Sequence, residues 1–140
     1  MSYSDPIAAQ TGFRRLAVGR RCLALIAQRY EYEGELVEEA NVLFLQVGAA
    51  QWLRFFFDAG QFFCRVESKL TLAEFAEEGM KFVPTDLSAR HHLVGQRIEQ
   101  VEFGEFPDGA ELRIAFEHAA ILVLRNASDQ STVDITSPVA

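Results

Sequence analysis

The sequence has little of what marks an enzyme, a membrane protein or a disulfide-bonded secreted protein. Only two of its 140 residues are cysteines, its nine glycines are scattered, and no apolar run approaches the ~20 residues that cross a bilayer as a helix. It contains neither a glycine-rich phosphate-binding loop nor a Gly-x-Ser-x-Gly nucleophile motif. Active sites assembled from distant residues leave no such motif, but the sequence favours a non-catalytic protein that does not enter a membrane.

The cysteines and histidines give no support to a metal site. Cys22 and Cys64 each lie within an apolar run, and buried free thiols behave as small hydrophobic side chains, which is typical of a reducing compartment. His91 and His92 are adjacent, but neighbouring residues on a helix point in different directions, and no further ligand has metal-site spacing. The first residues also lack a charged leader followed by an apolar stretch. We therefore expect a cytoplasmic protein with no metal and no cofactor.

Basic residues are scarce, and their distribution is uneven. The chain has thirteen Lys and Arg residues and twenty Asp and Glu residues, which gives a net charge of −7. Because nucleic-acid binding requires several phosphates to be neutralised, this composition argues against a nucleic-acid partner. Residues 1–29 hold five arginines against Asp5, a local charge of +4, which leaves −11 for residues 30–140. We interpret this split as a basic face beside an acidic one, with a basic segment contacting an acidic partner as the alternative.

The chain repeats part of its own sequence at a spacing of 59 residues. Residues 52–58 (WLRFFFD) align with residues 111–117 (ELRIAFE), and the same register continues from residues 62–64 to residues 121–123. A Val-Gly-x-Arg motif at residues 18–21 also recurs upstream of the second copy. A repeat of this kind indicates a recurring structural unit.

The upstream motif recurs at residues 94–97, a spacing of 76, so the first copy carries extra residues between Glu31 and Asn41. With 49% hydrophobic residues, the chain is long enough to bury one core. We predict a single domain, residues 1–140, with repeat units at about residues 18–67 and 94–135.

Each repeat predicts a β-hairpin. Leu53, Phe55 and Phe57 alternate with less apolar residues, as in a strand with one buried face, and the second copy repeats the pattern. The turns fall at residues 58–61 and 117–120, and a one-residue change in pairing there would exchange the two faces. Because alanine replaces glycine in the second turn, we predict the register that both copies can share. It places Phe57 opposite Phe62, and Phe116 opposite Ile121.

This register makes neither sheet face polar. One face carries an evident core: Leu53, Phe55, Phe57, Phe62, Cys64 and Val66. The other carries Arg54, Phe56, Phe63 and Arg65 in the first copy, and Arg113, Ala115, Leu122 and Leu124 in the second. Antiparallel sheets in water normally keep one polar face, so we expect a helix or another subunit to cover this one.

The residue types on this second face are those that anchor protein interfaces. The candidate interface is Trp52, Arg54, Phe56, Phe63, Arg65 and Arg113. In each repeat the arginine also lies four residues before an acidic residue, Asp58 or Glu117, so both point to one face. We expect the two charges to neutralise each other, and the carboxylates to accept turn amides.

Helices are expected in three places. The capping box at residues 71–74 predicts a short helix at about residues 72–78, ended by Gly79. A second runs from Asp86 towards Leu93, capped by Thr85 or Asp86. A third precedes Gly19, with a strand after it, and a final strand is predicted at residues 132–135. The expected fold class is α+β, mainly antiparallel sheet from two similar hairpin units with short covering helices.

The pattern Val94-Gly95-Gln96-Arg97-Ile98, followed by the 112–116 strand and a closing apolar strand, resembles small uncharacterised bacterial proteins. Some of these occur as immunity proteins beside polymorphic toxins. The resemblance implies a non-catalytic protein that binds and neutralises a partner through an acidic surface, and it carries over no site residues. The first functional hypothesis is a cytoplasmic protein-binding module that associates with itself or another protein, with immunity-type inhibition as its sharpest form. The alternative is a small-ligand-binding or enzymatic domain with a phenylalanine-lined pocket.

Overall fold

The computed structural model describes residues 2–3, 5–70, 79–128 and 130–137. In chain order its elements are β1 (Ser2–Tyr3), α1 (Pro6–Ala17), β2 (Ala24–Tyr32), β3 (Glu35–Gly48), β4 (Gln51–Asp58), β5 (Gln61–Glu67), β6 (Met80–Asp86), α2 (Leu87–Arg90), β7 (Ile98–Phe106), β8 (Gly109–Phe116), β9 (Ile121–Ala127) and β10 (Gln130–Thr136).

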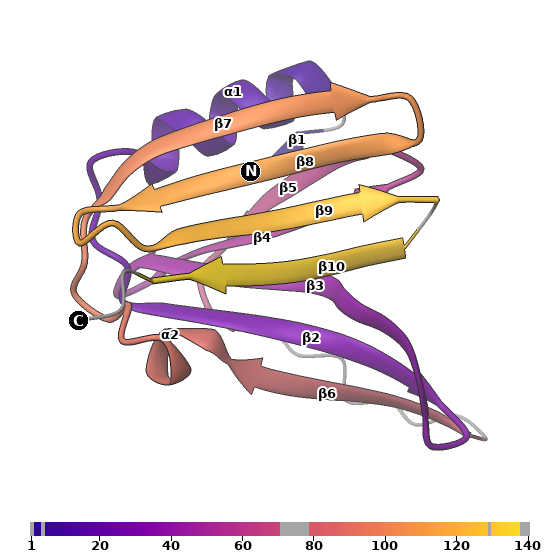
Figure 1. Ribbon diagram of the computed structural model, residues 1–140. Coiled ribbons are helices and arrows are strands. Elements are labelled where there is room, and N and C mark those ends of the chain that lie inside the picture. The colour runs from indigo at the N-terminus through magenta and orange to yellow at the C-terminus, as the bar shows by residue number, and fades with distance from the viewer. Residues whose placement is uncertain (1, 4, 71–78, 129, 138–140) are drawn as a thin grey trace.

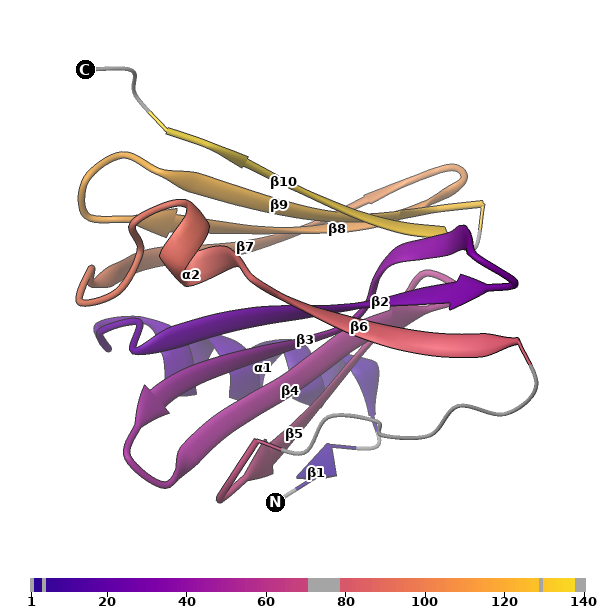
Figure 2. The same ribbon diagram turned by 90° about the horizontal axis from the view of Figure 1, so that it is seen from below.

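The strands form two antiparallel sheets that face each other (Figures 1 and 2). The larger sheet has the order β1-β5-β4-β3-β2-β6 and the smaller has the order β10-β9-β8-β7. The predicted fold class, α+β dominated by antiparallel sheet, is confirmed. The 59-residue spacing lays β3, β4 and β5 of the larger sheet on β7, β8 and β9 of the smaller one, and each trio is a meander.

The two Val-Gly-x-Arg segments meet at one end of the molecule. The Gly19 amide donates to the Ile98 carbonyl and the Cys22 amide to the Gln96 carbonyl, both at 2.8 Å. Arg21 and Arg97 face each other as an antiparallel bridge. The repeated segments therefore pair with each other and link the two sheets.

Helix α1 packs on the core between β5 and β7. Asp5 caps it by accepting from the Ile7 amide at 2.9 Å, and proline occupies its first turn, where the missing amide costs nothing. Phe13 is fully buried, with ring centroids 4.7 Å from Phe55 and 5.5 Å from Phe62. The helix therefore contributes a ring to a core shared by both sheets. Neither described helix is long and apolar enough to cross a membrane.

The first hairpin has the predicted register. Phe57 pairs with Phe62, and the apolar face of β4 and β5 lies in the core. Its two-residue turn has positive φ at both Ala59 and Gly60, 51° and 77°, which matches the twist of the strands. Glycine at position 60 makes this turn accessible at low cost.

The predicted register of the second hairpin is wrong by one residue. Ile121 pairs with Ala115, and not with Phe116, because this loop is one residue longer. Ala119 adopts φ 68°, and the Phe116 amide donates to the Ala120 carbonyl at 2.9 Å. This turn has one residue with positive φ, Ala119, whereas the first turn has two, Ala59 and Gly60, so the two copies turn differently. The shift exchanges the faces of β9, and the fully buried Leu122 and Leu124 belong to the core rather than to the outer face.

The helix predictions have three outcomes. Residues 72–78 lie outside the described residues. The second helix is confirmed but is shorter than expected: α2 ends at Arg90, and the Asp86 carboxylate caps it by accepting from the Ala89 amide at 3.0 Å. A helix precedes Gly19 and a strand follows it, as predicted, and the predicted 132–135 strand lies within β10.

Candidate functional site

Four of the six predicted interface residues form one patch on the outer face of the larger sheet. On neighbouring strands β4 and β5, Arg54 lies opposite Arg65 and Phe56 lies opposite Phe63. All four point away from the core, because their neighbours along each strand are the buried ones. We call Arg54, Phe56, Phe63 and Arg65 the Arg–Phe patch.

The aromatic rings and one arginine of the patch are stacked. The Phe56 and Phe63 ring centroids are 5.3 Å apart with their planes inclined by 18°, and Arg54 Cζ lies 5.2 Å from the Phe56 centroid. Both arrangements are attractive beyond simple burial, each by about 0.5–1.5 kcal/mol. The stacked side chains of the patch therefore hold one another in a fixed arrangement.

The charges of the patch are incompletely balanced. Arg54 and Arg65 are directly opposed across the strand pair, an arrangement of like charges that costs free energy. Glu67 partly compensates, with its Oε1 3.9 Å from Arg54 Nε. Burial lowers the pKa of Arg54, Glu67 raises it and Arg65 lowers it again. Two further carboxylates, Glu38 and Asp58, line a hollow with Phe56 at the other end of the patch.

Trp52 supports the patch from a buried position. It shares the outer face of β4 with Arg54, but only 9% of its surface is exposed. With Val42 and Phe44 it forms a second apolar cluster, against which Leu70 packs. The apolar centre of this face is therefore buried, and the helix predicted to cover it, at residues 72–78, lies outside the described residues. The Arg–Phe patch lies beside that cluster and remains partly exposed.

Arg113 does not belong to this surface. It lies on the outer face of the smaller sheet, on β8, where its Nε is 3.4 Å from Glu111 Oε1. The alternation of apolar residues along the strand correctly predicted that Arg113 points to an outer face. It did not show to which of the two sheets the strand belongs. The two equivalent arginines of the repeat therefore point in opposite directions from the molecule.

The predicted pairing of each arginine with the acidic residue four positions later is not found. Arg54 instead forms an ion pair with Glu67 on the next strand, β5. Glu117 instead accepts from the Arg97 amide at 3.0 Å and lies 3.3 Å from Arg21 Nη1. The hydrogen bond from Arg97 is the main cause that lowers the pKa of Glu117. Glu117 thus ties together the paired Val-Gly-x-Arg segments.

The two cysteines are both buried, and the adjacent histidines follow α2. Burial raises the pKa of both Cys22 and Cys64 to about 12, so each stays a neutral thiol at physiological pH. His91 is the C-cap residue of α2 and His92 is exposed. Within the described ranges, His, Cys, Asp and Glu side chains form no group of three that could hold a metal ion.

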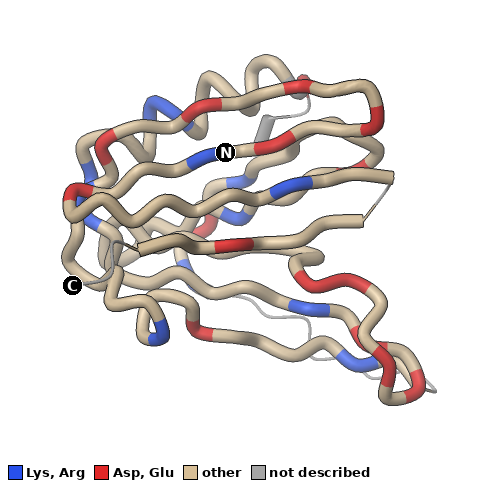
Figure 3. The backbone as a smooth tube through the Cα atoms, in the orientation of Figure 1, with Lys and Arg blue, Asp and Glu red and all other residues tan. Residues whose placement is uncertain are grey.

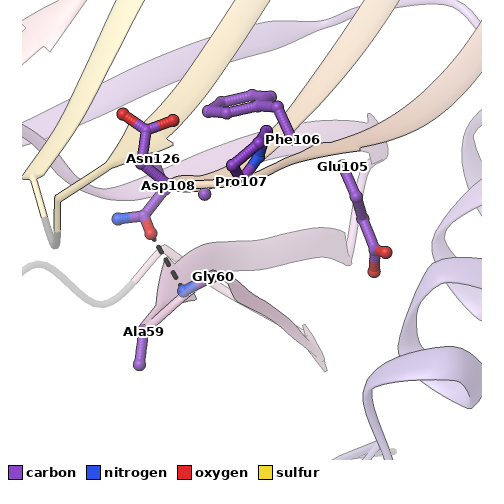
Figure 4. A pocket seen from close by; sticks show the side chains of 8 residues that line it. Ala59, Gly60, Glu105, Phe106, Pro107, Asp108 and Asn126 are labelled. Atoms are coloured by element: carbon purple, nitrogen blue, oxygen red, sulfur yellow. Dashed lines mark hydrogen bonds between the residues drawn. The ribbon is translucent and has the colours of Figure 1, made fainter.

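A hollow of about 440 Å³ opens between the β4–β5 and β7–β8 turns (Figure 4). Asn126, which sequence reasoning missed, is buried beside it, accepts from the Gly60 amide at 3.0 Å and donates to Ser131 Oγ at 3.1 Å. In Figure 4 the Glu105 side chain points away from Asn126. Asn126 therefore serves to join the two sheets, because its side chain is engaged on both sides. The core phenylalanines pack on one another and do not line this hollow.

Comparisons with family models, with curated proteins and with solved structures find no match for this chain. The fold and the site define it as a two-sheet α+β protein with an Arg–Phe patch on one outer face.

Proposed function

We propose that this protein is a protein-binding module and that the Arg–Phe patch is its contact surface. The observation that supports the proposal is that Arg54 and Arg65 lie opposite each other beside two stacked phenylalanine rings. Glu67 lies near Arg54, with 3.9 Å between Oε1 and Nε. An acidic segment of a partner would relieve the repulsion between these cations. We therefore expect the partner to present carboxylates together with an aromatic or aliphatic side chain.

The physical properties of the patch favour a protein partner of this kind. Arginine and aromatic residues are the side chains that most often dominate interface energetics. Arg54 is held over Phe56, so its guanidinium is already oriented and loses less side-chain entropy on binding. Charge-assisted hydrogen bonds to carboxylates contribute about 1.5–3 kcal/mol each when they are shielded from water.

Nucleic acid fits the same surface poorly. Aromatic rings and arginines also bind single strands, but affinity there depends on neutralising many phosphates. Two arginines in a chain of net charge −7 neutralise few of them. A short acidic peptide segment would instead place its carboxylates against the two opposed arginines.

The probe for this function is a fluorescent random copolymer of glutamate and tyrosine, with binding followed by fluorescence anisotropy at low salt. We expect Arg54→Gln with Arg65→Gln to weaken binding at least about tenfold, equivalent to ~1.4 kcal/mol. Arg113→Gln is the matched control, because it removes an exposed arginine from the opposite face. Raising the salt concentration should weaken binding to the native chain, since exposed charges are screened.

Equal binding by the native chain and the double variant would refute the proposal, as would an equal loss in the Arg113→Gln control. Urea unfolding of all three chains confirms that each is folded, so a lost interaction can be separated from a lost fold.

A further inference from the structure

The two Val-Gly-x-Arg segments form an exposed end of the molecule that the proposed function does not use. Arg21 and Arg97, the last residue of each motif, lie directly opposite each other in the antiparallel bridge. Cys22 and Ile98, the residues that follow them, are fully buried, whereas both arginines are exposed. The repeat therefore places two equivalent cations side by side on the surface.

Exposed aliphatic side chains flank this arginine pair. Val18 and Val94, the first residue of each motif, are 39% and 60% exposed, and each lies at a turn just before a glycine with positive φ. The Gly95 amide donates to the carbonyl of the residue before Leu23 at 2.7 Å, which brings Leu23, 41% exposed, close to Val94. The junction surface is the name we give to five residues: Val18, Arg21, Leu23, Val94 and Arg97.

The surroundings of the junction surface are positively charged. The three segments that meet there, residues 14–23, 90–99 and 115–120, hold six arginines and two glutamates, a net charge of +4 in a chain of −7. Glu117 neutralises part of this charge, with its Oε1 3.3 Å from Arg21 Nη1. Figure 3 shows blue segments gathered at the left-hand end, whereas the turns at the right-hand end are mainly red. The molecule therefore offers one end to an anionic surface.

We propose that the junction surface docks on the headgroup layer of an anionic phospholipid membrane. Arg21 and Arg97 bind lipid phosphates, because the planar guanidinium group matches two phosphate oxygens at once. The three aliphatic side chains enter the boundary between headgroups and acyl chains, where apolar groups of membrane-surface proteins are buried. The protein lies on the membrane and does not cross it. This contact is independent of the Arg–Phe patch, which lies on the larger sheet.

The side chains of the junction surface favour lipid over nucleic acid, although both carry phosphates. Single strands are held by aromatic rings that stack on the bases, and the apolar members of this surface are all aliphatic. Insertion of aliphatic groups is a property of lipid contact. The surface therefore combines the two kinds of side chain that a membrane surface binds.

The acidic remainder of the chain does not cancel this attraction. The nine residues of β7 lead from the junction surface to the opposite end, a length of about 30 Å. At physiological salt the Debye length is about 8 Å, so carboxylates at the far end are screened from the membrane. The local charge decides how the molecule is oriented.

Co-sedimentation with vesicles in low-salt buffer tests the proposal. The probes are vesicles of phosphatidylcholine alone and vesicles of phosphatidylcholine mixed with phosphatidylserine. We expect the native chain to bind the mixed vesicles and not the neutral ones. Arg21→Gln with Arg97→Gln should weaken binding at least about tenfold, because two charges are lost next to the anionic surface. Arg21→Lys with Arg97→Lys keeps the charge and should retain most of the binding.

A second variant leaves the arginines in place. Val18→Ser with Val94→Ser removes apolar groups that are already exposed, so we expect a stable fold and binding weakened at least about threefold. This variant tests the proposal even if the glutamine variant loses the contact of Arg21 with the Gly95 carbonyl. Unfolding midpoints confirm that every variant is folded.

Each variant has a matched control away from the junction surface. Leu36→Ser with Val37→Ser replaces two aliphatic residues of β3 that are 57% and 41% exposed. Arg113→Gln with Arg125→Gln removes two exposed arginines from β8 and β9 and makes the same change in net charge as the glutamine variant. Both controls should bind the mixed vesicles as the native chain does.

Three results would overturn the proposal. The first is a native chain that binds neither kind of vesicle or binds both equally, and the second is an equal loss of binding in the test variants and their controls. The third is a native chain that ignores the mixed vesicles but binds single-stranded oligothymidylate through Arg21 and Arg97, which would assign this surface to nucleic acid.

Discussion

Replacing Phe13 by alanine should cost about 4 kcal/mol of folding free energy. The side chain is 0% exposed, and its ring lies 4.7 Å, 5.5 Å and 6.4 Å from the rings of Phe55, Phe62 and Phe103. Truncating a buried phenylalanine removes the transfer free energy and leaves a cavity, together about 3–5 kcal/mol. Because α1 lies between β5 of the larger sheet and β7 of the smaller one, its neighbours are fixed on two sides and collapse into the cavity only in part.

Urea unfolding followed by far-ultraviolet circular dichroism measures this loss. Domains of this size are typically stable by about 5–15 kcal/mol, so the urea midpoint should fall by about a quarter or more. Ile7→Ala is the matched control: Ile7 is on the same helix but 75% exposed, and its replacement should change stability by less than about 0.5 kcal/mol. If the two variants lose the same stability, or Phe13→Ala loses less than about 1 kcal/mol, α1 is not docked as described.

Three other predictions follow from single contacts. A Cβ at Gly109 would overlap the backbone of β9, whereas at Gly104 it would meet only a side chain at 3.5 Å; Gly109→Ala should therefore lower the melting temperature far more than Gly104→Ala. The Asp86 cap of α2 contributes about 1 kcal/mol, which Asp86→Ala should remove at pH 7. A hydrogen bond from a side chain lowers the pKa of Asp86 below its ordinary 3.8, so this contribution should be complete above that pH and disappear as the pH falls further. Cys22 and Cys64 should react with iodoacetamide at pH 8 only after unfolding, and rapid labelling of the folded chain would contradict their burial.

Strand alternation predicted most of the local structure correctly. Leu53, Phe55 and Phe57 lie in the core. Side chains alternate with a period of two, so the sequence shows which face of a strand is buried even when the position of that strand in the fold is unknown. The same alternation cannot fix a loop length. The left-handed Ala119, which lengthens the second turn by one residue, depends on the surrounding fold and not on its own preference. That one residue moved Leu122 from the predicted outer face into the core.

The candidate site was predicted in part for a similar reason. Period-two alternation assigns Arg54 and Arg113 to outer faces, but it does not say that their strands belong to different sheets. Trp52 was expected at the surface because it alternates with core residues, yet a second apolar cluster buries it. The extra residues between Glu31 and Asn41 did not reveal how far the β2–β3 hairpin extends past β4, since the point where β3 leaves β4 depends on the packing of both sheets.

The pairing of the two Val-Gly-x-Arg segments has a consequence for the order of folding. Residues 19–22 find their partners only when residues 95–98 are present, and Arg14 of α1 donates to the carbonyl of Val101, 87 positions away, at 3.1 Å. During synthesis the helix can pack on β5 earlier, but it completes its contacts only after β7 has left the ribosome, when more than two thirds of the chain has been made. Such long-range closure slows folding. The two sheets should therefore appear together in stopped-flow refolding, as one late event, although each looks like a separate unit in the sequence.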